Sequence, residues 1–304
     1  MKVTVGTIIL MSLTSSICAE EFPPEGAASS ITWVKNDAPP FYITHDQCQR
    51  GFGDQVQTIL QKALPQYEHT TRYVPLSRLE HTWRQSNPVC FTTMIHEKPI
   101  NNEYRLSMPN AMYMPHGIIT TNRFADSLTL NSDGTLTLDK LLQRDGISMG
   151  HISGRTYSSR LDELLQKHAD NIEINTRAGA TETQGILTML SLGRFDFVID
   201  YEFVLNHYVD EANYAEQLRF IPISETRGDF ILGAVGCTNS EAGLAAIRAI
   251  NAALPDVLST RAYRRAVADW LVPVGDEVHY WQRFDDILEQ HLGKFTQPGE
   301  ALRH

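Results

Sequence analysis

The sequence predicts a two-lobed α/β protein, in which each lobe is a mostly parallel sheet flanked by helices and the chain crosses twice between the lobes. Short apolar runs typical of strands alternate with segments of helical periodicity along most of the chain. The chain has 304 residues, which suits two cores of about 100–150 residues better than one. No internal repeat is visible, which argues against a solenoid.

The first nineteen residues have the layout of an export signal. Lys2 precedes an apolar run over residues 3–13, and the small residue Ala19 precedes two glutamates. The run is well short of the ~20 residues that a membrane-spanning helix needs. We therefore expect cleavage after Ala19 and a mature protein in the periplasm. An alternative is a lipoprotein acylated at Cys18, but Ile17 is larger than that signal requires.

After a flexible leader over residues 20–30, residues 31–116 are expected to form the first part of lobe 1 in the order β-α-β-α-β. Pro39 and Pro40 end the first strand because proline has no N–H to donate, and Pro65 ends the first helix. The expected strands are 31–34, 70–74 and 89–94, and the expected helices are 56–64 and 75–84.

Residues 117–233 are expected to form lobe 2, and residues 234–304 return to lobe 1 with the C-terminal helices. The further strands are expected at 118–121, 147–150, 172–174, 195–199 and 230–235, and the further helices at 158–168, 181–192, 241–254, 263–271 and 280–292. The crossings are expected near 112–117 and 229–236. A ligand would bind in the cleft between the lobes, where strand ends and helix N-termini converge.

Charge and cysteine content limit the functions open to this chain. The formal net charge of −10 argues against nucleic acid and anionic membrane surfaces as partners. Removal of the signal leaves Cys48, Cys90 and Cys237, of which two can pair in an oxidising compartment. We expect a Cys48–Cys90 disulfide, with Cys237 as a buried free thiol. Neither the cysteines nor the histidines have metal-site spacing, so no metal or other cofactor is expected.

Five segments together resemble the periplasmic solute-binding proteins of family 3, which have the type II binding-protein fold. They are Trp33, Asp37 to Phe41, Gly51 to Asp54, Leu192 to Asp196, and Tyr263 to Trp270. The resemblance covers roughly residues 31–272. It implies two lobes that close on a small ligand and deliver it to a membrane transporter, such as an ABC transporter, or to a membrane sensor.

The chain departs from the amino-acid binders of that family at both charged clamps. Their carboxylate-binding arginine lies in a Thr-Glu-Lys-Arg-like run, and the matching run here, His96 to Pro99, has proline in its place. Their ammonium-binding acid follows a Gly-Arg-x-Asp motif, where Tyr201 falls here and Asp200 lies one position early. Lys98 would supply a point charge rather than a bidentate fork. The sequence therefore predicts a small polar ligand other than an ordinary α-amino acid.

Eleven residues at expected strand ends and helix starts are candidates for ligand contact. Phe41 and Tyr42 could stack on a ligand, and Arg155 beside a helix N-terminus could bind an anion. Each candidate also has a structural interpretation, such as a turn over the core, a helix cap or a surface ion pair. The candidates are Asp37, Phe41, Tyr42, Arg78, Thr92, Thr93, Arg155, Thr156, Tyr157, Glu182 and Tyr201.

The sequence thus favours a monomeric, non-enzymatic binder of a small polar solute. One alternative is a signalling accessory protein of a membrane receptor. Another is a periplasmic enzyme on the same fold, such as a dehydratase, with a carboxylate such as Glu182 as general acid–base group.

Overall fold

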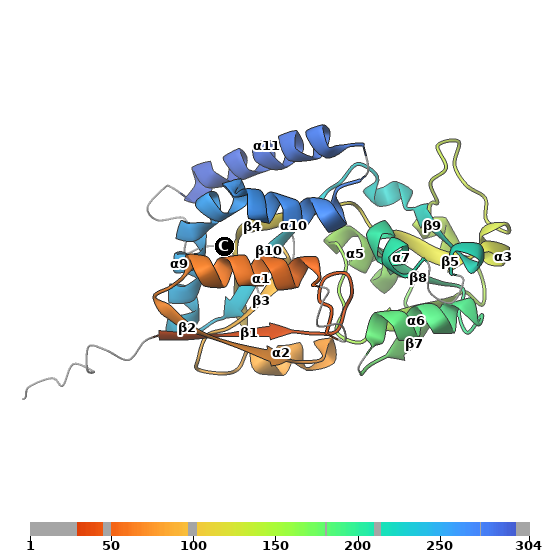
Figure 1. The fold of residues 1–304 in the computed structure, drawn as a ribbon. Coiled ribbons are helices and arrows are strands. Elements are labelled where there is room, and N and C mark those ends of the chain that lie inside the picture. Colours follow the sequence, from red (N-terminus) through yellow and green to blue (C-terminus); the bar gives the residue numbers. More distant parts are fainter. Residues whose placement is uncertain are drawn as a thin grey trace, which may run out of the picture.

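The computed structural model contains two five-stranded sheets flanked by helices (Figure 1). It describes residues 29–44, 50–96, 102–179, 181–209, 214–273 and 275–295. The predicted signal, most of the leader, Cys48 and residues 97–99 lie outside these ranges. We call the first sheet with its helices lobe 1 and the second sheet with its helices lobe 2. Among the described residues, no helix combines the length and the apolar character needed to cross a membrane.

The sheet of lobe 1 has the strand order β2-β1-β3-β10-β4. β1 pairs in parallel with β2 and β3, whereas β10 pairs antiparallel with β3 and β4. The strands are β1 (Ser29–Lys35), β2 (Tyr67–Tyr73), β3 (Val89–Ile95), β4 (Tyr104–Tyr113) and β10 (Ile231–Thr238).

The sheet of lobe 2 repeats this arrangement with the order β7-β6-β8-β5-β9. β6 pairs in parallel with β7 and β8, and β5 pairs antiparallel with β8 and β9. The strands are β5 (Gly117–Thr121), β6 (Ser148–Ile152), β7 (Glu173–Arg177), β8 (Phe197–Asp200) and β9 (Leu218–Pro222).

The predicted two-lobed α/β class with two crossings is confirmed. The chain passes between the sheets from β4 to β5 and again from β9 to β10. Each sheet has three parallel strands joined through helices, and the strands that flank the crossings add antiparallel pairs, so both sheets are mixed. The lobe boundaries predicted at residues 116 and 233 stay predictions.

The strands β4 and β9 were not predicted from the sequence. In β4, Ser107 and Asn110 interrupt the apolar pattern, yet both are fully buried. The Ser107 hydroxyl accepts a hydrogen bond from Val235 N (2.9 Å), and the Asn110 amide donates to the carbonyl of Thr92 (2.9 Å). Neighbouring strands pair the Ser107 hydroxyl and the Asn110 amide nitrogen, so both residues can lie inside the sheet.

Lobe 1 carries its larger helices on one side of its sheet (Figure 1). Helix α1 packs against α9 and α10, α9 packs on β4 and β10, and α11 packs on β4. The helical elements are α1 (Phe52–Ala63), η1 (Leu76–Arg78), α2 (Leu79–Thr82), α9 (Glu241–Ser259), α10 (Arg261–Leu271) and α11 (Glu277–Phe295). The predicted helix over 75–84 is therefore a 3-10 turn followed by a short α-helix.

Lobe 2 has shorter helices around its sheet. They are α3 (Asn122–Ala125), α4 (Leu138–Leu141), α5 (Ser159–Lys167), α6 (Glu182–Ser191), α7 (Glu202–Tyr208), α8 (Tyr214–Gln217) and η2 (Ser224–Thr226). Helix α6 contacts β5 and β6, and α7 contacts β5.

The C-terminal helices hold the strand that leads into the first crossing. The hydroxyl of Tyr263 on α10 donates to the carbonyl of Asn110, and that of Tyr280 on α11 donates to the carbonyl of Met112. Both tyrosines are almost completely buried. These bonds fix the end of β4 from outside the sheet, so the crossing begins from a rigid base.

The disulfide joins Cys90 to Cys237, so the predicted Cys48–Cys90 pair and the free thiol at Cys237 are wrong. The two cysteines are directly opposite each other on the antiparallel strands β3 and β10, with Cα atoms 4.2 Å apart. The prediction favoured neighbours in sequence, but β10 returns to lobe 1 after the whole of lobe 2 and pairs beside β3.

Candidate functional site

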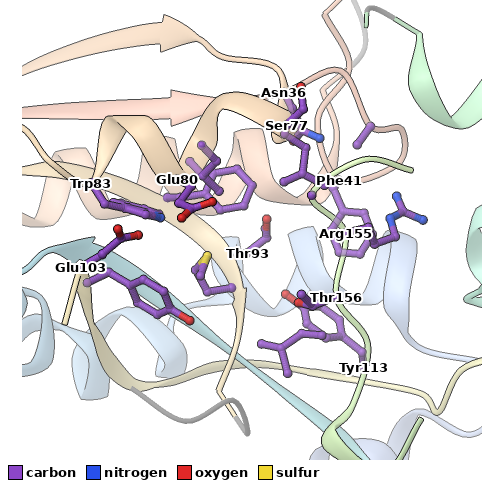
Figure 2. Close-up of a pocket in the computed structure, with 18 of the residues that line it drawn as sticks. Asn36, Phe41, Ser77, Glu80, Trp83, Thr93, Glu103, Tyr113, Arg155 and Thr156 are labelled. Carbon is purple, nitrogen blue, oxygen red and sulfur yellow. The ribbon is translucent and has the colours of Figure 1, made fainter. Parts of the chain in front are cut away.

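A cavity of about 320 Å³ lies between the two lobes (Figure 2). This volume is at the lower end of the range usual for small-molecule sites, roughly 300–1,000 Å³. Lobe 1 contributes Asn36, Ala38, Phe41, Leu76, Ser77, Leu79, Glu80, Trp83, Phe91, Thr93, Met94, Ile95, Glu103, Tyr104 and Tyr113. The first crossing contributes His116, and lobe 2 contributes Gly154, Arg155, Thr156 and Tyr201.

The turn that carries Phe41 is tied to both β1 and α1 by one buried carboxylate. Asp54, in the first turn of α1, accepts hydrogen bonds from Ile43 N (2.9 Å) and Gly51 N (3.2 Å). It also forms an ion pair with Lys35 at the end of β1 (2.9 Å). The turn is therefore held in place on the wall of the cavity.

The lobes touch through backbone at Gly154, in the loop after β6. Its φ angle is +84°, a conformation that favours glycine. A Cβ atom at this position would lie 2.8 Å from the carbonyl oxygen of Leu76 and 3.2 Å from the Cα of Ser77, both on η1 of lobe 1. Only a residue without a side chain allows this approach.

Aromatic rings connect the lobes on one side of the cavity. Phe41 of lobe 1 has its ring centroid 6.0 Å from that of Tyr201 and 5.4 Å from that of Phe203 in lobe 2. Tyr113, at the end of β4, lies 5.6 Å from Tyr201, and His116 stacks on Tyr201 at 4.1 Å. Aromatic pairs of this kind contribute about 0.5–1.5 kcal/mol each beyond the area they bury. They favour the arrangement in which the lobes are together.

An ion pair between Arg155 and Asp200 lies on the lobe 2 side. Arg155 Nη1 donates to Asp200, and the backbone N–H of Tyr201 donates to the same carboxylate (2.9 Å). The Asp200 side chain is 3% exposed and the Arg155 side chain 15%. Burial alone would lower the pKa of Arg155, but interactions with Asp200, Tyr157 and Tyr201 raise it overall. The guanidinium is therefore a fixed, charged donor at the cavity wall.

Two carboxylates and two aromatic rings form the opposite part of the cavity. Glu103 accepts from Arg84 at 3.2 Å, and Glu80 lies 3.7 Å from the same guanidinium. The rings of Trp83 and Tyr104 lie 5.6 Å apart. Figure 2 shows Glu80, Trp83 and Glu103 grouped at one side, with Arg155 and Thr156 at the other and Thr93 between them.

The structure places five of the eleven predicted contact residues on the wall of this cavity. They are Phe41, Thr93, Arg155, Thr156 and Tyr201. They come from both lobes, although they are as much as 160 positions apart in the printed sequence. Ligand contact by each of them stays a prediction.

The other six predicted residues are not among the lining residues. Tyr42 and Thr92 are fully buried and hydrogen-bonded to each other. Tyr157 is buried against the rings of His116 and His151. Arg78 is exposed on η1.

Asp37 and Glu182 are buried carboxylates that bind backbone or hydroxyl groups. Asp37 accepts from the hydroxyl of Thr44 at 2.5 Å and from its N–H at 3.3 Å. Glu182, at the start of α6, accepts from Gly179 N at 3.3 Å, and burial raises its pKa. Both carboxylates therefore have local partners in the fold.

Sequence reasoning missed the acidic part of the cavity. Glu80 and Trp83 are three residues apart, a spacing that places side chains on one helix face, so this pair could have been found. Glu103 and Tyr104 lie at the start of β4, a strand that the sequence did not reveal.

No model of a known protein family matches the sequence, and no curated protein matches it. Solved structures do match in fold. The chain is 13% identical to an ancestral amino-acid-binding protein described as a precursor of cyclohexadienyl dehydratase, with a TM-score of 0.59, covering 81% of this chain and 96% of that one.

Two further structures come from named bacteria. A periplasmic binding protein of an arginine transport system from Legionella pneumophila is 16% identical, with a TM-score of 0.56, covering 81% of this chain and 100% of that one. The VFT2 domain of BvgS from Bordetella pertussis is also 16% identical, with a TM-score of 0.53, covering 79% of this chain and 92% of that one. At these identities the likeness establishes architecture: the chain has the two-lobed fold of type II periplasmic binding proteins.

Proposed function

We propose that this protein is an exported solute-binding protein, which captures a small polar solute between its lobes and presents the closed form to a membrane transporter or sensor. The observation that carries the proposal is a ligand-sized cavity whose wall comes from lobe 1, the first crossing and lobe 2 together. A solute that contacts both lobes stabilises the closed arrangement over open ones, which is how binding is converted into a change of shape.

The proteins of similar fold support this proposal and both kinds of partner. The Legionella protein is described as part of a transport system, and the Bordetella structure is a domain of BvgS. The altered clamp positions at Pro99 and Tyr201 favour a solute other than an ordinary α-amino acid. Because other proteins of this fold are described with bound arginine or glutamine, amino acids belong in any ligand screen.

Binding is favoured over catalysis by the position of the acid–base candidate. Glu182 is 2% exposed and is not among the residues that line the cavity. A general acid–base group must come within hydrogen-bond reach of the substrate. A solute held in this cavity would meet Arg155, Glu80 and Glu103 instead.

A thermal-shift screen of amino acids, short peptides, polyamines and organic acids tests the proposal. A true ligand at 100 times its Kd adds about 2.7 kcal/mol of stability, which raises the Tm by roughly 5–10 °C for a chain of this size. The ligand should be recovered unchanged. Turnover of the solute, or no stabilisation by any member of the panel, would contradict a binding role.

A further inference from the structure

We propose that the chain has a second ligand site, a cavity at the second crossing that binds the phosphate or carboxylate group of a small anion. The site is separate from the cavity between the lobes, so the inference goes beyond the proposed function. It is carried by two buried hydroxyl groups and two guanidinium groups on one cavity wall, all four without a partner among the described residues.

This second cavity lies where α5, the crossing from β9 to β10, and α11 meet. Its volume is about 310 Å³, and it has no lining residue in common with the first cavity. Its polar lining residues come from lobe 2, the crossing and lobe 1. In that order they are Ser158 and Arg160, Thr226 and Asp229, and Arg283.

Two hydroxyl groups of this lining are buried and unused. Ser158 is 5% exposed and Thr226 is 3% exposed. Neither hydroxyl has a hydrogen-bond partner among the described residues. Buried hydroxyl groups are nearly always paired in native proteins. Two such groups on one cavity wall indicate that a ligand with acceptor oxygens completes their hydrogen bonding.

Ser158 begins α5 without capping it in the usual way. A serine at an N-cap normally accepts a hydrogen bond from an N–H of the first turn, whereas the Ser158 hydroxyl makes no such bond. Helix α5 has nine residues, and its start carries a partial positive charge. Asp162, the acid of the first turn, accepts from Tyr157 N (3.1 Å) and is not among the lining residues. This helix start therefore suits a negative group.

Two arginines line the cavity from different lobes. Arg160 lies in the first turn of α5, and Arg283 lies on α11. Both are exposed, and in the part of the chain that the structure describes neither has a carboxylate partner. A guanidinium binds carboxylate and phosphate oxygens through its fork of N–H donors. Asp229 is the one acid among the lining residues, so positive groups outnumber negative ones.

This set of groups favours an anion over other ligands. A cation would meet two positive side chains, and a neutral molecule would give them no opposite charge. The chain as a whole has a formal net charge of −10, so the positive wall is a local feature and not part of a generally basic surface.

Calorimetry at pH 7 and constant ionic strength tests the site. The probes are inorganic phosphate, phenyl phosphate and benzoate, with benzyl alcohol as the uncharged control. We expect at least one anion to bind tenfold or more tightly than benzyl alcohol. The phosphates and benzoate distinguish the two head groups, and phenyl phosphate against inorganic phosphate distinguishes an organic anion from a free one.

Two single variants test whether both lobes contribute. Arg160→Gln and Arg283→Gln should each raise the Kd of the best anion about tenfold, because each removes a charge-assisted contact. Arg194→Gln/Arg265→Gln is the matched control, because it removes one exposed arginine from each lobe away from this cavity and should leave the Kd unchanged.

Thr226→Val tests the buried hydroxyl separately from the fold. It should weaken the best anion severalfold. It should not lower the free energy of unfolding, because a methyl group replaces a buried hydroxyl that has no partner.

Each contrary outcome overturns the inference. The proposal is wrong if no anion binds more tightly than benzyl alcohol, or if the control variant weakens binding as much as the single variants do. It is also wrong if Arg160→Gln, Arg283→Gln or Thr226→Val leaves the Kd unchanged. None of these measurements needs a solute in the first cavity, so failure here leaves the proposed function standing.

Discussion

Gly154→Ala tests whether the contact between the lobes is part of ligand binding. A methyl group at residue 154 would lie 2.8 Å from the carbonyl oxygen and 3.0 Å from the carbonyl carbon of Leu76. These are backbone atoms of the other lobe, so they cannot swing away as the end of a flexible side chain can. The lobes must then stay apart by several tenths of an ångström.

Gly154→Ala has two separate free-energy costs, and only one of them changes the Kd for the ligand. An alanine at a φ of +84° loses about 1–2 kcal/mol in every state of the protein, open or closed. The steric conflict with Leu76 arises only when the lobes meet. Overpacking of this kind costs about 1–3 kcal/mol, which corresponds to a Kd about 5- to 150-fold higher.

Gly134→Ala is the matched control. Gly134 has a φ of +79°, and a Cβ atom there would have no neighbour within 4 Å. Urea unfolding should show a similar loss of stability in both variants, whereas calorimetry should show weaker ligand binding only in Gly154→Ala. If both variants bind the ligand equally well, the contact at Gly154 plays no part in binding and the closure mechanism is refuted.

Three further predictions concern the disulfide, the ion pair and the buried glutamate. Because the bridge closes a loop of 147 residues, chain-entropy arguments predict that Cys90→Ala/Cys237→Ala lowers the free energy of unfolding by about 5 kcal/mol. A loss below about 1 kcal/mol in urea, or a Cys48–Cys90 peptide in non-reducing mass mapping, would contradict this. Arg155→Ala leaves Asp200 buried without its counter-ion and should lower the free energy of unfolding by about 3–5 kcal/mol. The double variant Arg155→Met/Asp200→Asn should recover most of that loss. If urea unfolding shows the same loss in both variants, the two charges are not coupled. Because burial raises the pKa of Glu182, the folded protein holds that proton more tightly, and stability falls as pH rises from the ordinary glutamate pKa through the raised one. Glu182→Gln should therefore be at least as stable as the wild type at pH 7, and the difference should disappear in acid; a less stable variant at pH 7 would contradict the assignment.

The parts of the fold that follow from local pattern could be predicted from the sequence. The strand β8 is recognisable from its continuous apolar run, which is typical of a strand buried on both faces. The helix α9 is recognisable from its helical spacing of apolar residues, which is typical of burial on one face. The segment β4 carries no such signal. Its buried Ser107 and Asn110 fit into a strand because β10 supplies a partner for the Ser107 hydroxyl and β3 supplies one for the Asn110 amide nitrogen.

The residues of the site could likewise be predicted only where a local sequence pattern indicated them. Arg155 and Phe41 could be proposed from sequence because each lies at the end of a predicted element. Glu103 and the Cys90–Cys237 bridge depend on which strands become neighbours, and that is decided by topology across more than a hundred residues. Residue spacing along the chain cannot predict such contacts.

Small-angle X-ray scattering of the purified protein, with and without a saturating ligand from the screen, tests the central claim most directly. The claim is that two lobes close on a solute held between them. We expect a smaller radius of gyration with ligand, and a smaller decrease for Gly154→Ala than for Gly134→Ala. Identical scattering curves with and without a ligand that calorimetry shows to be bound would contradict it.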